Sequence, residues 1–200
     1  WSKDEMFISD LITMLDNILQ HFIDNAVDTS QLGEYNANYK RFKNYVREGK
    51  EGFTKATYSA YRERSIGLGA MGFHAYLQSK NIPFEGLFAT SFNYRAFKHI
   101  KENSVEASKK LAEIRGEAPD VANSGMRNAH LLAVAPNASS SIICGGTSPS
   151  IEPYRANVYS HKTLSGSYQV KNKFLEKLLK SKGLRVKELE KLWKDIAGKD

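Results

Sequence analysis

The chain has 200 residues, of which 41% are hydrophobic and 26% charged, a composition that excludes a wholly disordered protein and suffices for one globular core or a large piece of one. No stretch approaches the roughly 20 consecutive apolar residues of a membrane span, and the opening Trp-Ser-Lys-Asp-Glu is no secretory leader, so the expected location is cytoplasmic. The net charge of +7 admits a nucleic-acid partner, whereas the single cysteine, Cys144, excludes an internal disulfide and a Cys-rich zinc site.

The first predicted element is an amphipathic helix from about residue 3 to 26. Ser2 and Glu5 have the spacing of a capping box. Apolar residues then recur at helical spacing: Phe7, Ile8, Leu11, Ile12, Leu15, Ile18, Leu19, Phe22 and Ile23. A chain that begins one residue before such a helix, without an initiator Met, indicates a piece of a longer polypeptide.

The next segment is polar. Residues 28–53 are rich in Tyr, Lys and Asn, which predicts a surface excursion with one short helix around 36–47. Residues 55–63 fit either a loop or a strand, and the pattern leaves both open.

A glycine-rich motif, Arg-Ser-Ile-Gly-Leu-Gly-Ala-Met-Gly, covers residues 64–72. Gly67, Gly69 and Gly72 spell G-x-G-x-x-G, which between a strand and a helix would indicate a dinucleotide site. The preceding Tyr-Arg-Glu-Arg-Ser-Ile is too charged for a buried parallel strand, and no acidic strand end follows about 20 residues later. The alternative, which we favour, is that the glycines permit close packing of a helix against a sheet.

Two helices are predicted after this motif, over residues 73–80 and about 88–115, separated by Asn-Ile-Pro-Phe. The long one has an apolar stripe of Phe88, Phe92, Phe97, Ile100, Val105, Ala107, Leu111, Ala112 and Ile114. Its expected exposed positions are Lys101, Glu102, Ser108, Lys109, Lys110 and Glu113.

The apolar run 131–135 predicts a strand buried on both faces, which ends at Pro136. The small polar residues that follow it, Asn137-Ala-Ser-Ser-Ser141, precede Ile142 and Ile143. Backbone amides and serine hydroxyls at such a strand-to-helix junction form an anion pocket, although an ordinary serine N-cap turn explains the pattern equally well.

The C-terminal part predicts strands or an extended loop over 150–159 and 163–170, then amphipathic helices over 171–200 with solvated basic faces. Such faces argue against nucleic-acid binding, which stays the second interpretation. Glu152 fits a loop residue better than a functional acid, and the five histidines show no metal-ligand spacing, so no metal is expected.

Three segments, in this order and at these separations, resemble the large catalytic subunit of class I ribonucleotide reductase, with the versions of large tailed bacteriophages closest. They are Arg64–Gly72, Ala135-Pro-Asn-Ala-Ser-Ser-Ser-Ile142, and Ser150-Ile-Glu-Pro-Tyr154 with Leu164-Ser-Gly166. The resemblance implies a portion of the ten-stranded α/β barrel, divided into a helix (1–27), a variable excursion (28–63), the barrel core (64–179) and a basic helical end (180–200).

By this resemblance the glycines serve packing, and the serine-rich turn binds the diphosphate of the substrate ribonucleotide. The implied substrate-binding residues are Asn137, Ala138, Ser139 and Ser140, with Ser141 as a weaker addition. The family's chemistry needs three active-site thiols, and this chain has only Cys144, which we expect to be a small buried hydrophobe outside that trio.

The resemblance therefore implies no catalytic residue and no cofactor bound by this chain, and an inactive isolated chain. The complete enzyme would need the remainder of the large subunit, joined covalently or as a split chain. It would also need the metal–tyrosyl radical of a small subunit, a dithiol reductant such as thioredoxin or glutaredoxin, nucleotide effectors and ribonucleoside diphosphates. A phage-encoded version would act in the host cytoplasm, in deoxyribonucleotide synthesis for DNA replication.

Overall fold

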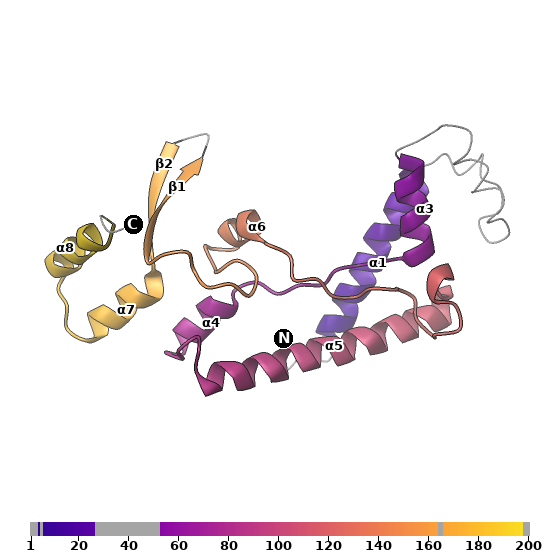
Figure 1. The fold of residues 1–200 in the computed structure, drawn as a ribbon, viewed down its shortest axis with the longest axis horizontal. Helices are drawn as coiled ribbons and strands as arrows, with labels where there is room; N and C mark the ends of the chain where they lie inside the picture. The colour runs from indigo at the N-terminus through magenta and orange to yellow at the C-terminus, as the bar shows by residue number, and fades with distance from the viewer. Residues whose placement is uncertain (1–3, 5, 27–52, 164–165, 198–200) are drawn as a thin grey trace. The chain divides into compact units, whose positions relative to one another are not determined.

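The computed structural model describes residues 4, 6–26, 53–163 and 166–197, and these fall into two units. Unit 1 comprises residues 1–69 and 94–133, and unit 2 comprises residues 70–93 and 134–200. The elements, in chain order (Figure 1), are α1 (Phe7–Ala26), α3 (Phe53–Glu63), α4 (Phe73–Ser79), α5 (Leu87–Arg115), the 3-10 turn η2 (Pro119–Val121), α6 (Ala138–Ile143), β1 (Val158–Thr163), β2 (Gly166–Lys171), α7 (Lys173–Ser181) and α8 (Val186–Ala197).

Unit 1 is built on α1, which packs beside α3 (Figure 1). Of its predicted apolar stripe, Ile8, Ile12 and Ile23 are buried, whereas Phe7 and Ile18 are 40% and 54% exposed. Ile8 and Ile12 of α1 are buried against Ala107 and Leu111 of α5. Ile66, Leu68, Ile100 and Leu131 are partly buried against this core. The predicted helix 3–26 is thus confirmed from Phe7 onward, whereas its capping box includes residues outside those described, as does the helix predicted around 36–47.

Two extended segments of unit 1 lie side by side and run parallel. Leu68 pairs with Leu132, and the backbone N–H groups of Ile66 and Leu68 donate to the carbonyls of His130 and Leu131 at 2.9 and 2.8 Å. The approach is close. A Cβ on Gly67 would lie 2.8 Å from the Cβ of Ala133, and one on Gly69 would lie 2.6 Å from the carbonyl oxygen of Ala133. Gly67 and Gly69 therefore serve packing, between two extended segments instead of between a helix and a sheet.

The prediction of a doubly buried strand at 131–135 is wrong for the described chain. Val134 is 67% exposed, and only the bridge at Leu132 is formed. A strand is buried on both faces when neighbouring strands and helices cover it. Among the described residues, this segment has one paired neighbour.

Unit 2 contains α4, the beginning of α5, and the chain from residue 134 onward. Phe73 and Tyr76 of α4 stack on Phe92 of α5, with ring centroids 5.8 and 4.5 Å apart. β1 and β2 form an antiparallel hairpin that pairs Val158 with Lys171. Of the regions predicted as strands or extended loop, 163–170 falls largely within this hairpin, whereas 150–157 contains no strand.

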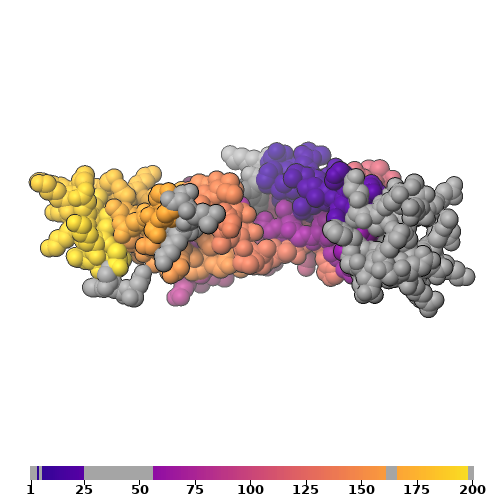
Figure 2. Space-filling model, turned by 90° about the horizontal axis from the view of Figure 1, so that it is seen from above, coloured from indigo at the N-terminus to yellow at the C-terminus, as the bar shows by residue number. Residues whose placement is uncertain are grey.

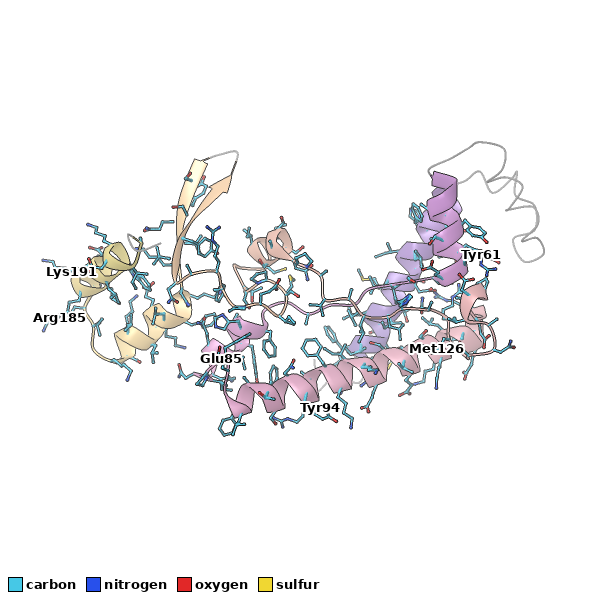
Figure 3. All side chains as sticks on the ribbon, viewed as in Figure 1. Tyr61, Glu85, Tyr94, Met126, Arg185 and Lys191 are labelled. Carbon is cyan, nitrogen blue, oxygen red and sulfur yellow. The ribbon has the colours of Figure 1, made fainter. Side chains whose placement is uncertain are left out.

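The helices α7 and α8, drawn in yellow in Figure 2, form one contiguous group of side chains whose buried centre is Val158, Leu189 and Trp193. The charged side chains are directed outward, as Lys191 of α8 and Arg185 in the link between the two helices are in Figure 3. The amphipathic helices predicted for 171–200 are confirmed.

Three local predictions were wrong. Residues 55–63, which fitted a loop or a strand, lie in the helix α3. Ser108, placed on the exposed face of the long helix, is fully buried, and its hydroxyl is satisfied there by donating to Oδ1 of Asn128 at 3.0 Å. Phe88 and Ile114, placed on the buried stripe, are 78% and 79% exposed, because each lies near an end of α5.

Within the residues described, no helix is long and apolar enough to cross a bilayer.

Candidate functional site

The serine-rich turn predicted as an anion pocket forms the short helix α6 in unit 2, immediately after Asn137. Pro136 precedes the helix and has no N–H to extend it backward. The first helical hydrogen bond runs from the N–H of Ser141 to the carbonyl of Asn137, at 2.9 Å. The N–H groups of the residues between have no helical acceptor, because helix geometry leaves the first N–H groups unpaired.

These unpaired donors face an open surface. Ala138, Ser139 and Ser140 are exposed, and the Asn137 side chain makes no capping hydrogen bond. Within the part of the chain that the structure describes, the Ser139 and Ser140 hydroxyls make no hydrogen bond. Three N–H groups and two hydroxyls thus gather at one helix start, where the peptide dipoles also favour an anion.

Ser141 has a different role in the turn. It is buried, its hydroxyl donates to the carbonyl of Ala138 at 2.7 Å, and its own carbonyl accepts from the N–H of Thr147 at 3.1 Å. Both its hydroxyl and its N–H are engaged within the turn, so Ser141 shapes the turn.

The far end of the turn is fixed by two side chains. The Tyr154 hydroxyl donates to the carbonyl of Gly146 at 3.0 Å, and the Lys173 ammonium donates to the carbonyl of Gly145 at 3.1 Å. Thr147 lies against Gly72, where a Cβ would come within 2.6 Å of the Thr147 Oγ1, and Gly72 has a φ of +79°. Only glycine satisfies both conditions without strain.

The N-terminus of α4 is already occupied by protein. The N–H groups of Gly72 and Ala75 donate to the carbonyl and the hydroxyl of the buried Ser148, at 2.9 and 3.0 Å. A longer bond of 3.5 Å runs from the Phe73 N–H to the Ser150 carbonyl. A pyrophosphate would have to displace Ser148 to reach these amides, and α3 precedes the motif where a dinucleotide fold needs a strand. The geometry thus argues against the dinucleotide interpretation of the glycines.

Burial sets the ionisation of the two rings beside the turn. It lowers the pKa of His74, and it raises the pKa of Tyr154, with a further contribution from Tyr159. His74 is therefore neutral at pH 7, and Tyr154 keeps the proton that it donates to Gly146. No metal-ligand group of three His, Cys, Asp or Glu side chains occurs among the described residues.

The prediction that Cys144 is a buried small hydrophobe is wrong, because Cys144 is exposed. It caps the C-terminus of α6, a helix of six residues with one buried side chain, that of Ser141. Glu152 is also exposed, as expected of a loop residue.

A buried ionic cluster in unit 1 escaped the sequence analysis. Asp16 of α1 is fully buried and contacts three arginines: Arg64 (Nη2–Oδ1 2.8 Å), Arg115 (Nη1–Oδ2 2.9 Å) and Arg127 (Nε–Oδ2 3.4 Å). The Asn128 side-chain amide also donates to Asp16, at 3.1 Å. A signal for it existed, because Asp16 shares the apolar face of Ile12 and Ile23, where a carboxylate needs partners.

The cluster controls the charge of its carboxyl group. Burial by itself would raise the pKa of Asp16, but the hydrogen bonds and positive charges of Arg64, Arg127 and Arg115 outweigh it, and the pKa lies below its usual value. Arg127 also donates to the carbonyls of Arg115 and Gly116 at the end of α5. Asp16 thus ties α1 to the ends of α3 and α5.

Comparison with known proteins supplies the family context. The chain matches the family described as "Ribonucleotide reductase, barrel domain" over residues 13–124 and 117–198, a region that extends beyond 64–179 on both sides. It is 42% identical over 196 residues to the ribonucleoside-diphosphate reductase large subunit of Invertebrate iridescent virus 3, and 41% identical over 197 residues to the putative large subunit of Frog virus 3. Both relatives are viral, in agreement with the viral character of the resemblance.

These alignments cover 98% of this chain but 28% and 30% of the two relatives, so the chain spans less than a third of their length. Among solved structures, it is similar to the alpha subunit of the class Id ribonucleotide reductase of Actinobacillus ureae. That match has a TM-score of 0.64 and 36% identity, and it covers 78% of this chain and 29% of the other.

Proposed function

Because the chain belongs to the family of the ribonucleotide reductase barrel domain, we propose that it supplies the substrate diphosphate-binding turn of a ribonucleoside-diphosphate reductase. The reaction would reduce ribonucleoside diphosphates to deoxyribonucleoside diphosphates for DNA synthesis. The observation that carries this proposal is the start of α6, where the N–H groups of Ala138, Ser139 and Ser140 and two serine hydroxyls have no partner within the described chain.

A diphosphate suits this arrangement. Its oxygens accept hydrogen bonds and carry negative charge, and the start of α6 offers donors and a favourable dipole without a lysine. In the proposal, the backbone N–H groups and the hydroxyls of Ser139 and Ser140 bind phosphate oxygens. Asn137 begins the turn, and Ser141 holds its shape through the bond to the Ala138 carbonyl.

The rest of the chemistry would come from outside these residues. Removing the ribose hydroxyl requires a radical and two reducing thiols in this family, and the chain contains one cysteine. We therefore assign it no catalytic residue. The barrel core, which we place at 64–179, would act with the remainder of the large subunit, covalently attached or as a separate chain.

The proposed partners are a small radical-generating subunit with a metal–tyrosyl centre and thioredoxin or glutaredoxin as reductant. Nucleotide effectors would act on the assembly. The expected place of action is the cytoplasm, that of the host if a virus encodes the protein.

The first test is to purify the protein from its native source through a tag and to assay the assembly for cytidine diphosphate reduction with a dithiol. Turnover is expected only when a polypeptide that carries the missing cysteines is present. Turnover by the 200 residues on their own would contradict the assignment of the catalytic thiols to other residues.

The second test addresses the turn itself. Exchanging both Ser139 and Ser140 for Ala should weaken cytidine diphosphate binding by roughly tenfold or more, because a hydrogen bond to a charged group contributes about 1.5–3 kcal/mol. Ser181→Ala is the matched control, since Ser181 is exposed and its hydroxyl bonds within α7. Unchanged affinity in the double variant would contradict the proposed contacts of the two hydroxyls.

A further inference from the structure

His74 is joined to the diphosphate turn by a chain of hydrogen bonds within unit 2. Its Nδ1 accepts from the backbone N–H of Tyr154 at 2.9 Å, and the Tyr154 hydroxyl donates to the carbonyl of Gly146 at 3.0 Å. Gly146 in turn donates its N–H to the carbonyl of Ile142 in α6, at 3.2 Å. Three consecutive hydrogen bonds therefore connect α4 to the helix whose start offers the unpaired donors.

We propose that His74 is a positioning residue for substrate binding, which in its neutral form holds Tyr154 and thereby the diphosphate turn of α6. This inference rests on the proposed function of that turn. In this proposal His74 does not touch the substrate. It acts through Tyr154, whose backbone N–H it binds.

The hydrogen bond fixes which form of the imidazole is needed. An N–H donor faces Nδ1, so Nδ1 must carry a lone pair and the proton must be on Nε2. A protonated imidazole carries a hydrogen on both nitrogens, which would set two donors against each other and break the bond to Tyr154.

The surroundings of His74 agree with a neutral ring. Phe84 meets it edge-on at 5.4 Å between centroids, and the Tyr154 ring lies at 5.5 Å. α4 contains no Asp, Glu, Lys or Arg, and the Tyr154 ring is a titratable group in contact with His74. Glu152 and Arg155, the charged neighbours of Tyr154 in sequence, are exposed. Burial keeps the ring neutral by lowering its pKa below the usual 6.5.

The segment that Tyr154 contacts contains two adjacent glycines, so its conformation depends on such contacts. The Tyr154 hydroxyl donates to the carbonyl of Gly146. Gly145 and Gly146 both have positive φ angles, of 79° and 65°. Glycines in that region give the backbone wide conformational freedom. The side chains of Tyr154 and Lys173 help to select one conformation, together with the N–H bonds of Gly146 and Thr147 to α6 and the contact of Thr147 with Gly72.

Two variants separate hydrogen bonding from ring packing. In His74→Asn, the amide oxygen can accept from the Tyr154 N–H but does not titrate. In His74→Phe, a ring of similar size keeps the contacts with Phe84 and Tyr154 but cannot accept a hydrogen bond. Dissociation constants for cytidine diphosphate are measured on the native polypeptide that bears these residues, at several values of pH from 7.5 to 5.5.

At pH 7.5 we expect Asn at this position to preserve affinity within about twofold, and Phe to weaken it about tenfold, the equivalent of one hydrogen bond. Between pH 7.5 and 5.5 the wild type should weaken progressively relative to His74→Asn as the imidazole gains its second proton, and by no more than the roughly tenfold loss expected for the Phe variant. Taking this ratio at each pH cancels the titration of the diphosphate itself. In the complete enzyme, the Phe variant should raise KM for cytidine diphosphate and leave kcat unchanged.

Failure of this inference differs from failure of the proposed function. If the wild type binds cytidine diphosphate and the Phe variant binds it equally well at every pH, the role of His74 is refuted and the turn remains a diphosphate site. If the wild type binds no cytidine diphosphate at any pH, the function proposed for the turn fails and the inference fails with it. The Tyr154 amide resonance, followed by NMR without ligand, should shift with pH in the wild type and not in His74→Asn; a resonance insensitive to pH would also refute the role.

Discussion

Replacing Asp16 by Asn tests how strongly the buried ionic cluster stabilises unit 1. The variant keeps the shape of the side chain but removes the negative charge that contacts three guanidinium groups. One amide oxygen can still accept from Arg64 Nη2 and Asn128 Nδ2, which lie 2.8 and 3.1 Å from Oδ1. The amide NH2 then faces Arg115 and Arg127, which lie 2.9 and 3.4 Å from Oδ2.

The expected loss of unfolding free energy depends on the hydrogen-bond partners that each arginine retains in the variant. Removing one partner of a buried ion pair costs about 3–5 kcal/mol. Arg115 is 33% exposed and also bonds to Asn17, and Arg127 keeps two carbonyl acceptors. These alternatives place the expected loss near the lower limit, at about 3 kcal/mol.

Hydrogen exchange measured by mass spectrometry on the full chain reports this loss locally. A cost of about 3 kcal/mol corresponds to roughly 100-fold faster exchange in peptides from the middle of α1 and the end of α5. Asp10→Asn is the control, since Asp10 is exposed on the same helix and should change exchange little. Equal exchange in the two variants would refute the reasoning and show that the arginines are satisfied without the carboxylate.

Three further predictions follow from the described contacts. The pKa of Asp16 is lower in the folded chain than in the unfolded chain, so the stability that this carboxylate contributes should be complete above pH 3.8 and lost as the pH falls through the folded pKa. In acid unfolding followed by circular dichroism, the Asp16→Asn variant should therefore lack this pH-dependent loss of stability. Gly67→Ala and Gly69→Ala should each destabilise by about 1–3 kcal/mol in urea unfolding, and a second change, Ala133→Gly, should rescue only the former, because Gly67 meets the Ala133 methyl and Gly69 meets its backbone oxygen. Cys144 should react with a thiol reagent in the native chain as fast as in urea, and protection of the thiol in the native chain would contradict its exposure.

The elements that sequence predicted well are those specified by local periodicity. The apolar residues of α1, and those of α7 and α8, recur every three to four positions, so each helix shows its buried face without reference to other segments. The position of α6 was likewise indicated locally, by Pro136 before a run of small polar residues. For β1 and β2, alternation indicated strands or an extended loop, but it did not pair them as a hairpin.

The features that sequence missed depend on partners far along the chain. Asp16 meets Arg64, Arg115 and Arg127 at separations of 48, 99 and 111 residues, and no periodicity links these positions. Ser108 was placed on the exposed face because only its tertiary partner Asn128 explains its burial. α3 was left open between loop and strand because the segment is polar overall, so its helical pattern was not recognised.

Other errors came from treating a pattern as if its surroundings were known. The run 131–135 has the composition of a doubly covered strand, yet burial depends on neighbours that one segment does not specify. The glycines of residues 67–72 match a dinucleotide fingerprint in spacing. Only the contacts distinguish a packing role from a dinucleotide site, since Ala133 lies against Gly67 and Gly69 and Thr147 lies against Gly72.

The long separations within the ionic cluster bear on how fast unit 1 folds. A chain must close loops of about fifty to more than a hundred residues before Asp16 meets its arginines, and the entropy of closing such loops is lost before any ion pair forms. The apolar contact between α1 and α5 has a similar separation but needs no defined hydrogen-bond geometry. It can therefore form first and bring the charged groups together. The ion pairs of Asp16 would then slow the unfolding of unit 1 and have little effect on its folding rate.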